Sequence, residues 1–396
     1  TLEFKVMTNA FGPQFGRSGG GVVNVVTKGG TSDFHGSAYE FFRNDRLRAN
    51  NFFANARGQQ RGIFHFNMFG GSVGGPMRKN RTFFFADYQG HRESASFGGR
   101  SLTIPTVAQK QGDFSDVRSA ANRPVIIYDP FTTRSVNGRL VRDAFAGNRI
   151  PQTRLDKAAA AMQRYIPDPN RPGEGPARIN NWVYAPNETT VSDQWSARVD
   201  HRFSDAHSIF FRATRNTGNS FNTGEFNTIA DTTSILFTNN TWNAVINGTL
   251  VMNPTSVFNY RLGFTRRDGN QITGSNQEVK LTDLGFPAEL SARVQKETFP
   301  QATFTGYAPI GTPPDAPQTN DVYVAVAEHT LIRGKHTFTY GTDMRLYNQN
   351  VFRPSAASGV CGFTRGFTQG PDPQVASLEA GDAFASFLTG YGSGSV

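Results

Sequence analysis

Cysteine is almost missing from this chain, since Cys361 is the only one among 396 residues. A lone thiol excludes an intramolecular disulfide and a cysteine-based metal site. The Gly-rich segment around Cys361 contains no motif, so the sequence assigns it no role, and no metal or cofactor is predicted elsewhere.

Long apolar runs are also missing. Mean hydropathy is -0.45, and no stretch approaches the roughly 18 to 20 apolar residues that a membrane helix requires. A helical membrane protein is therefore excluded. A membrane β-barrel is not, because its strands alternate apolar and polar residues and each apolar side chain is averaged against a polar neighbour.

Charge is not clustered, although the net charge is +9. Basic residues are scattered without a block of five like charges, whereas a nucleic-acid groove more often shows a clustered stripe. Nucleic acid is therefore not an expected partner. The opening segment TLEFKVMTNAFGP has neither the basic start nor the apolar stretch of a signal peptide. Either the protein is cytoplasmic or its true N-terminus lies upstream.

Phenylalanine and strict alternation are abundant instead, with 35 Phe in the chain. In TWNAVINGTLVMNPTSVFNYRLGFTR, residues 241–266, apolar residues recur at every second position on both sides of the turn signal NPTS. This period of two predicts strands with one apolar and one polar face. Each arm runs about ten to twelve residues, roughly twice the usual strand length, so a thick apolar layer is expected against the apolar face.

The same pattern predicts ten strands, at about 34–45, 64–75, 82–92, 194–203, 207–217, 239–252, 256–267, 322–332, 336–348 and 381–389. Four connections are short turns (PMRKNR, SDAH, NPTS, RGKH), and the others are long: 46–63, 93–193, 218–238, 268–321 and 350–380. Short and long connections alternate, which places every long one at the same end of an antiparallel meander. This layout is typical of outer-membrane barrels. A large soluble β-sandwich, lipocalin-like barrel or propeller is the alternative, but such folds favour strands of about five to six residues.

One long connection contains a predicted helix at 153–167, TRLDKAAAAMQRYIP. Thr153 is its expected N-cap and Pro167 its stop. The helix has one apolar stripe, so we expect it to pack this loop onto itself or over the mouth of a barrel.

The Gly-rich stretch FGRSGGGVVNVVTKGGTSDFHG, residues 15–36, invites comparison with a nucleotide-binding loop. The phosphate-loop spacing is missing, and a strand former, Val22–Val26, follows where a phosphate site needs a helix. We therefore expect close backbone approach at Gly19 to Gly21 and a buried strand at Val22–Val26.

The Gly-rich stretch is part of a longer family signature, TNAFGPQFGRSGGGVVNVVTKGGTSDFHGSAYEFFRND. It is followed by FGGSVGGPMRKNRTFFFADYQG and, later, by DQWSARVDHRFSDAHSIFFR and DAFASFLTG. Together they resemble the TonB-dependent outer-membrane receptors of the Oar-like type, in which a plug domain ends in a GGVVNVVTK-like strand and passes into the barrel. The resemblance covers essentially the whole chain and is specific in its first hundred residues. The residues that carry the plug-end motif are Arg17, Gly19, Gly20, Gly21 and Asn24.

The resemblance implies an all-β fold, an antiparallel transmembrane β-barrel of which about ten strands of an expected 22 are present, preceded by the C-terminal end of a plug. Residues 1–30 would be the plug end and 31–396 the N-terminal part of the barrel, with a long extracellular loop at 93–193. On this interpretation the chain is an internal fragment located in the cell outer membrane. An open sheet or a distorted closure is then expected, because ten strands leave two unpaired edges.

The function implied is energy-coupled uptake of a scarce or large substrate, with outer-membrane lipid and the inner-membrane TonB complex as partners. The substrate itself is unknown. The alternative is a surface protein for adhesion, polymer binding or protein export without TonB-driven uptake. An enzyme is not expected, because no Ser/His/Asp or paired-carboxylate motif emerges.

Two sets of strand residues are candidates for function. Lumen-facing candidates, which could contact plug or substrate or simply pair across strands, are Arg198, Asp200, Arg202, Arg212, Asp343 and Arg345. Lipid-facing aromatic candidates are Trp195, Trp242, Tyr260, Phe264 and Tyr347.

Overall fold

The computed structural model describes residues 3–8, 20–56, 58, 61–96, 99–273, 279–311, 315–353 and 357–395. Arg17 and Gly19 of the plug-end motif lie outside these ranges.

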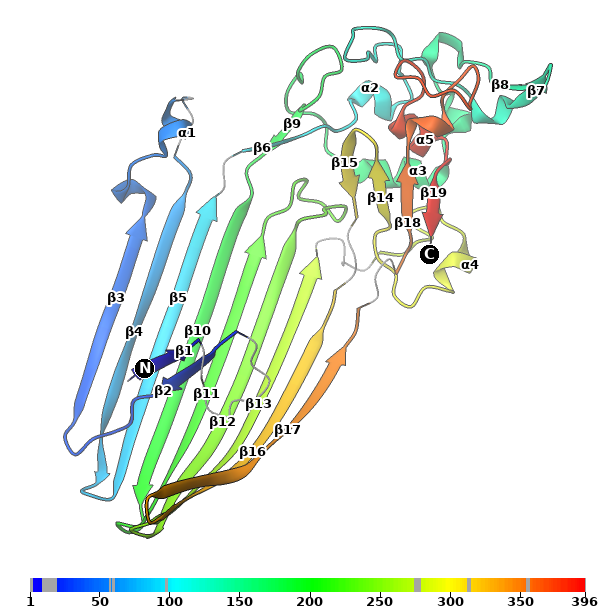
Figure 1. Cartoon of the computed structure of the whole chain (residues 1–396). Helices are drawn as coiled ribbons and strands as arrows, with labels where there is room; N and C mark the ends of the chain where they lie inside the picture. The colour runs from blue at the N-terminus through cyan, green and yellow to red at the C-terminus, as the bar shows by residue number, and fades with distance from the viewer. Residues whose placement is uncertain are drawn as a thin grey trace.

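A nine-stranded antiparallel sheet dominates the structure (Figure 1). Neighbours in the sheet are neighbours in the chain, so the strands form a simple meander. They alternate along their length between apolar and polar side chains, which is why each has two chemically different faces. The strands are β3 (His35–Asn44), β4 (Phe64–Arg78), β5 (Thr82–Ser96), β10 (Asn187–Arg202), β11 (His207–Asn222), β12 (Ile235–Asn253), β13 (Ser256–Thr273), β16 (Gln318–Arg333) and β17 (His336–Val351).

Short and long connections alternate between these strands, which confirms the predicted layout. The four tight turns lie at one end of the sheet and the long connections at the other (Figure 1). Most strands run longer than predicted, and β12 reaches 19 residues. The long loop therefore spans 97–186 between β5 and β10 rather than the predicted 93–193, because polar residues at its ends continue the hydrogen-bonded ladder.

The sheet is open, as the sequence predicted. Strand β3 forms one edge and β17 the other. In the described ranges each of them pairs with its inner neighbour alone, and its outward side has no partner strand. Strand β17 is exposed along its whole length.

Strands β1 (Glu3–Met7) and β2 (Val22–Val26) form a separate two-stranded sheet. The strand at Val22–Val26 was predicted correctly, but the prediction that it is buried was wrong. Val23 is 61% exposed and Val25 51%. Within the described part of the chain β2 pairs with β1 alone, and Val22 is its only half-buried valine.

A compact unit, here called the loop domain, lies at the end of the sheet that carries the long connections (Figure 1). It consists of residues 99–186, 223–234, 279–311 and 357–395. With the exception of Phe85, every buried hydrophobic side chain found in the described residues belongs to it. Its elements are β6 (Arg100–Leu102), α2 (Val107–Lys110), β7 (Arg134–Val136), β8 (Arg139–Val141), α3 (Lys157–Met162), β9 (Trp182–Tyr184), α4 (Ala288–Ser291), β14 (Gln301–Phe304), β15 (Tyr307–Ile310), β18 (Val360–Phe363), α5 (Ala383–Leu388) and β19 (Ser393–Ser395).

Hydrogen bonds join distant segments in the loop domain. Strand β14 pairs in parallel with β18, which lies about sixty residues further along the chain. The amide of Asp156 donates to the carbonyl of Leu388 at 2.8 Å, and the amide of Gly311 donates to the carbonyl of Ala230 at 2.8 Å. Three of the long connections and the segment after β17 therefore form one shared core rather than separate loops.

The tenth predicted strand, 381–389, was wrong, because this segment forms helix α5. Asp382 caps the helix, and Gly390 follows it with φ of +74°. Ser386 stands between apolar neighbours, so the segment shows no helical period, and all six residues of α5 are buried. A helix surrounded by core on every side loses the polar stripe that would reveal its period.

The predicted helix at 153–167 is confirmed only in part. Helix α3 covers Lys157–Met162 and is flanked by 3-10 turns at Gln152–Arg154 and Gln163–Tyr165. Asp156, rather than Thr153, is the N-cap, with its Oδ1 accepting from the amide of Ala159 at 2.9 Å. The remaining helix, α1 (Phe52–Ala56), precedes β4. No helix in the described ranges has the length and apolar character needed to cross a membrane.

Candidate functional site

All six predicted charged candidates lie on one face of the sheet, here called the polar face. Register and alternation fix this: Arg198 pairs directly with Arg212, and Asp200 and Arg202 follow on the same side of β10. On β17, Asp343 and Arg345 lie on that same side. Asp343 is in register with Val326 of β16 and through it with Arg261 of β13, and Arg345 is in register with Val324 and through it with Gly263.

Arg198 is the charged residue on this face that contacts the N-terminal segment. Its Nη1 donates to the carbonyl oxygen of Thr27 at 3.2 Å and to Thr27 Oγ1 at 3.1 Å. Asp200 orients the guanidinium by accepting from Nη2 at 2.6 Å and from Nε at 2.9 Å. The Phe210 ring lies 4.0 Å from the guanidinium carbon. Asp200 and Phe210 therefore hold Arg198 toward Thr27.

The chain after Thr27 stays close to the same strands. A Cβ added at Gly29 would lie 3.0 Å from Oδ2 of Asp200, and one added at Gly30 would lie 2.2 Å from the carbonyl oxygen of Phe84. Glycine is needed at Gly30 because any side chain would collide with the backbone of β5. The plug-end motif thus leads into a glycine pair fitted against the sheet.

Arg212 lies next to this contact and is only partly satisfied. Its Nη2 donates to Oδ1 of Asn243 at 3.2 Å, while its buried Nε has no partner among the described residues. Arg198 and Arg212 together line a cavity of about 530 Å³ with Lys28, Asp87 and other polar residues of β5, β10, β11 and β12. Two guanidinium groups opposite each other give this cavity a positive wall.

The other charged candidates lie apart from this cavity. Arg345 pairs with Asp343 on its own strand at 2.7 Å, and Arg202 approaches Asp205 of the adjacent turn at 3.9 Å. Both are exposed ion pairs, which contribute little to stability.

Four of the five predicted lipid-facing aromatics lie on the opposite side of the sheet, here called the apolar face. Trp195 and Trp242 both pair in register with Arg215, and Phe264 contacts Tyr323 with ring centroids 5.1 Å apart. Tyr260 follows on the same side of β13. The prediction for Tyr347 was wrong: strict alternation along β17 places it on the polar face with Arg345.

Gly20, Gly21 and Asn24, the plug-end residues that the structure describes, do not line the polar-face cavity. Asn24 pairs with Lys5 in the small sheet, and a Cβ at Gly21 would lie 3.0 Å from the carbonyl oxygen of Met7. Gly20 has open space around it. The close approach predicted for Gly19 to Gly21 is therefore confirmed at Gly21 and wrong at Gly20, while Gly19 lies outside the described residues.

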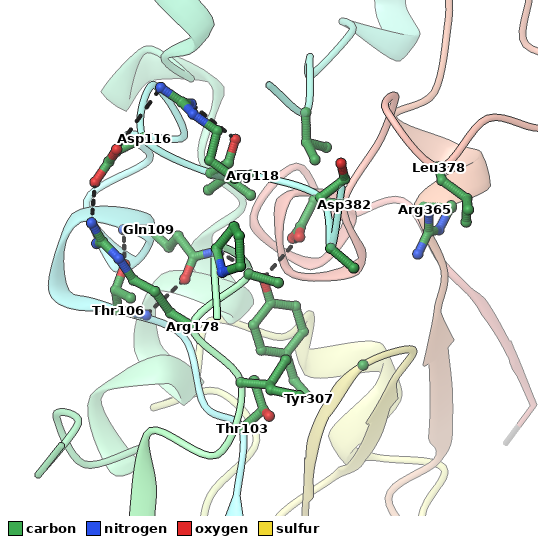
Figure 2. Close-up of a pocket in the computed structure, with 18 of the residues that line it drawn as sticks. Thr103, Thr106, Gln109, Asp116, Arg118, Arg178, Tyr307, Arg365, Leu378 and Asp382 are labelled. Carbon is green, nitrogen blue, oxygen red and sulfur yellow. Dashed lines mark hydrogen bonds and ion pairs between the residues drawn. The ribbon is translucent and has the colours of Figure 1, made fainter. Parts of the chain in front are cut away.

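A second cavity, of about 460 Å³, lies in the loop domain between the 103–125 segment, Tyr307 and Asp382 (Figure 2). Sequence reasoning missed it. The Tyr307 hydroxyl donates to Oδ2 of Asp382 at 2.8 Å and accepts from Nε2 of Gln109 at 2.7 Å. Gln109 is itself fixed by a capping box with Thr106 at the start of α2. The Thr-x-x-Gln spacing was a signal that could have located this helix.

Burial dominates the electrostatics at the back of this cavity. Desolvation raises the pKa of Asp382, although Tyr307 and the amides of Phe384 and Ala385 donate to the carboxylate and act in the opposite direction. Desolvation also raises the pKa of Tyr307, with the neighbouring Asp382 as the second cause. The pair thus connects α5 to β15 by a hydrogen bond that has little competition from water.

The mouth of the cavity is charged. Asp116 accepts from Arg178 at 2.5 Å and lies 3.9 Å from Arg118, and Arg365 also lines the cavity (Figure 2). The arrangement can hold a small polar or anionic group, but it offers no nucleophile and base pair for chemistry.

Comparison with protein-family models finds a match to the outer membrane beta barrel domain over residues 26–396. Among curated proteins, the TonB-dependent transporter Oar of Myxococcus xanthus is 32% identical over 90 residues, which are 22% of this chain and 8% of that protein.

Two solved structures align at low identity. The ferric-catecholate import receptor Fiu of E. coli is 12% identical, with a TM-score of 0.40, over 88% of this chain and 50% of Fiu. The ferric enterobactin receptor PfeA of Pseudomonas aeruginosa is 10% identical, with a TM-score of 0.32, over 84% of this chain and 42% of PfeA. The chain thus spans half or less of the length of each of these relatives.

Proposed function

This chain belongs to the outer membrane beta barrel domain family, and from that premise we propose that it forms part of the wall of an energy-coupled transporter in the outer membrane of Gram-negative cells. Residues 1–30 are then the end of a plug, the polar face lines the lumen, and the apolar face contacts lipid.

The contact between Arg198 and Thr27 carries this proposal. A segment that precedes the sheet is held on the polar face by two hydrogen bonds, and the following glycines are fitted against β5 and β10. A plug that closes a polar pore needs such a contact, which must be specific when closed and weak enough to break. A hydrogen bond to a charged group contributes roughly 1.5–3 kcal/mol, which a mechanical pull on the plug can overcome.

Transport on this proposal involves binding and displacement, without covalent chemistry. Substrate would bind to the loop domain and lumen, and the inner-membrane TonB complex would then pull on the plug and open a path along the polar face. The substrate is admitted because the closed and opened states bind it differently. Arg198 and Arg212 keep that path positively charged.

A second candidate function is adhesion, polymer binding or protein export without TonB-driven uptake. The loop domain favours it, because three connections and the segment after β17 share one core. Two of these connections and the segment after β17 line a cavity of about 460 Å³. A folded surface unit of this kind can bind a partner without opening the pore.

The test is the energy dependence of uptake in cells that carry the complete protein. Culture media from cells with and without the gene are compared by mass spectrometry, in hosts with an intact or a deleted TonB complex. A compound that disappears only when both are present supports uptake. Disappearance that survives deletion of the complex, or that washing reverses, contradicts uptake and supports surface binding.

A matched pair of cysteine variants sharpens the test. Gly29→Cys with Asp200→Cys places two thiols across the contact between plug end and wall, and oxidation should abolish uptake until a reductant is added. Gly29→Cys alone is the control and should transport under both conditions. Uptake that continues through the oxidised pair would contradict plug movement at this position.

A further inference from the structure

A single row of residues marks a change of chemistry on the apolar face. Hydrogen-bond register aligns Trp195, Arg215, Trp242 and Arg266 on neighbouring strands β10 to β13. The row toward the tight turns is apolar: Ala197, Ala213, Ala244 and Phe264. The row toward the loop domain is polar: Asp193, Thr217, Asn240 and Asp268.

The apolar band below this row has the height of a membrane interior. On β12 it runs from Trp242 to Met252, ten residue steps. At a rise of about 3.4 Å per residue and a tilt of about 40°, that is roughly 25 Å, the height of the apolar band on outer-membrane barrels. Since long loops face the cell exterior in such barrels, the row lies at the level of the outer-leaflet headgroups.

A groove opens on the apolar face beside this row. It has a volume of about 700 Å³. Its floor is made of the small side chains of Ala86, Ala197 and Ala213, and its walls include the rings of Trp195 and Trp242. Large rings around small residues leave a channel for a slender apolar group such as an acyl chain.

The third wall of the groove is held rigidly. The Tyr88 hydroxyl donates to Oδ1 of Asp193 at 2.6 Å, and Arg92 pairs with the same carboxylate at 2.8 Å. Tyr88 also packs against Trp195, with ring centroids 5.6 Å apart. This side of the groove is therefore built before any ligand arrives.

Arg215 supplies a positive charge at the rim of the groove. Its guanidinium carbon lies 4.5 Å from the centre of the Trp242 ring, and the side chain is exposed. No carboxylate of the described chain pairs with it. Arg266 in the same row differs, because Asp268 lies 3.3 Å and Asp321 3.8 Å from its Nε. Arg215 is the arginine of this row whose charge is left without an acidic partner.

We propose that this groove binds a phosphorylated lipid of the outer leaflet, with an acyl chain between Trp195 and Trp242 and a phosphate on Arg215. Lipid A, the phosphorylated and acylated anchor of lipopolysaccharide, has both groups at the required level. A guanidinium matches a phosphate with paired N–H donors, and its stacking on Trp242 orients it beforehand. The groove and the polar-face cavity lie on opposite faces of the same strands. The site rests on the proposed contact of the apolar face with lipid, but not on TonB-driven uptake.

The experiment measures how much lipid A the complete protein retains. Purified protein is incorporated into nanodiscs of phosphatidylcholine containing lipid A, re-extracted in mild detergent, and analysed by native mass spectrometry. Parallel samples contain lipid A freed of its phosphates, or inorganic phosphate alone. We expect retention of phosphorylated lipid A only.

Arg215→Gln should reduce retention about tenfold, because one charge-assisted contact is lost. Ala213→Phe, which fills the groove without changing charge, should reduce it to a similar degree. Arg261→Gln is the matched control: Arg261 is exposed on the polar face of β13 and makes a single bond to Asn247 at 3.3 Å. Its retention should equal that of the unmodified protein.

Three results would overturn the proposal. They are equal retention of dephosphorylated lipid A, unchanged retention in Arg215→Gln, and an equal loss in Arg261→Gln. Folding of each variant is verified by its heat-dependent mobility on a gel, so that loss of a lipid site is distinguished from loss of the barrel.

Discussion

On the sheet, Phe211 is 46% exposed and Leu262 56%, whereas in the loop domain Phe384 and Ile127 have no exposed surface at all. Both regions come from one chain of modest mean hydropathy, yet they place apolar side chains in opposite ways. The loop domain surrounds them with protein, and the sheet presents them outward. The difference indicates that the two regions fold in different solvents: water covers the loop domain, and on our proposal lipid covers the apolar face.

The largest expected effect comes from removing a core side chain of the loop domain. Phe384→Ala deletes a ring with no exposed surface and should destabilise this domain by about 3–5 kcal/mol. Hydrogen exchange at the amide of Asp156, which donates to Leu388 at the end of α5, should speed up strongly. Phe211→Ala on the apolar face is the control and should leave that amide protected. Equal deprotection by both variants would break the distinction between the regions.

A charge on the apolar face should have the next largest effect. Leu262→Arg places a guanidinium near the middle of the apolar band and should cost about 2–4 kcal/mol, measured as the urea midpoint of the folded barrel in lipid vesicles. Asn259→Arg on the same strand faces the polar side, opposite Glu328, and should be tolerated. A tolerated Leu262→Arg would mean that the apolar face does not contact lipid.

The loop domain should also lose stability as pH rises. Burial raises the pKa of Asp231 to about 6, with Glu225 as a further cause. Between about pH 4 and pH 6 the folded state therefore keeps a proton that the unfolded state has lost, and stability falls with rising pH by up to about 3 kcal/mol. The measurement is the urea midpoint of loop-domain unfolding at pH 4.5 and pH 8, by pulse proteolysis.

Asp231→Asn is the matched variant for this slope. It should lower the stability at both pH values, because Oδ2 accepts from the amide of Thr228, but it should flatten the pH dependence. A slope that persists in Asp231→Asn would assign it to another group.

The smallest expected effect concerns the polar face, where charge rather than burial makes the contact. Arg198→Gln removes the bonds to Thr27 and should weaken the hold on residues 27–30 by about 1.5 kcal/mol, or about tenfold in amide exchange of that segment. Arg345→Gln is a close control, since Arg345 has the same arrangement with Asp343 two residues away. Unchanged amide exchange of residues 27–30 in Arg198→Gln would mean that Arg198 does not hold this segment on the polar face.

The sheet was largely predictable from sequence because the pattern that specifies each strand lies in neighbouring residues of the chain. An exposed apolar face and a polar face produce a period of two, which residues 241–266 display without reference to the rest of the chain. Nine strands, their meander order and all four tight turns follow from that pattern. The prediction for Tyr347 was wrong because it followed from the aromatic ring alone. The apolar residues of this strand occupy even-numbered positions, and Tyr347 is at an odd-numbered one.

The loop domain was not predictable for the opposite reason. Its core joins short segments, such as Ile104, Phe226, Phe299 and Phe384, that lie far apart in the sequence. None is long enough to display a period, and α5 is apolar on every side. The polar contact of Arg198 with Thr27 was likewise only a possibility from sequence, since residue type does not specify which polar neighbour a guanidinium meets.

The shared core also imposes an order on biogenesis. Ala308 bonds to Thr103, and Leu388 bonds to Asp156, across separations of about two hundred residues. Contacts of such high contact order form slowly, because a large loop must close before they contribute. The loop domain therefore cannot fold one hairpin at a time. Its core can form only after every contributing segment has reached the same side of the membrane. Folding of the loop domain is therefore a late step of assembly.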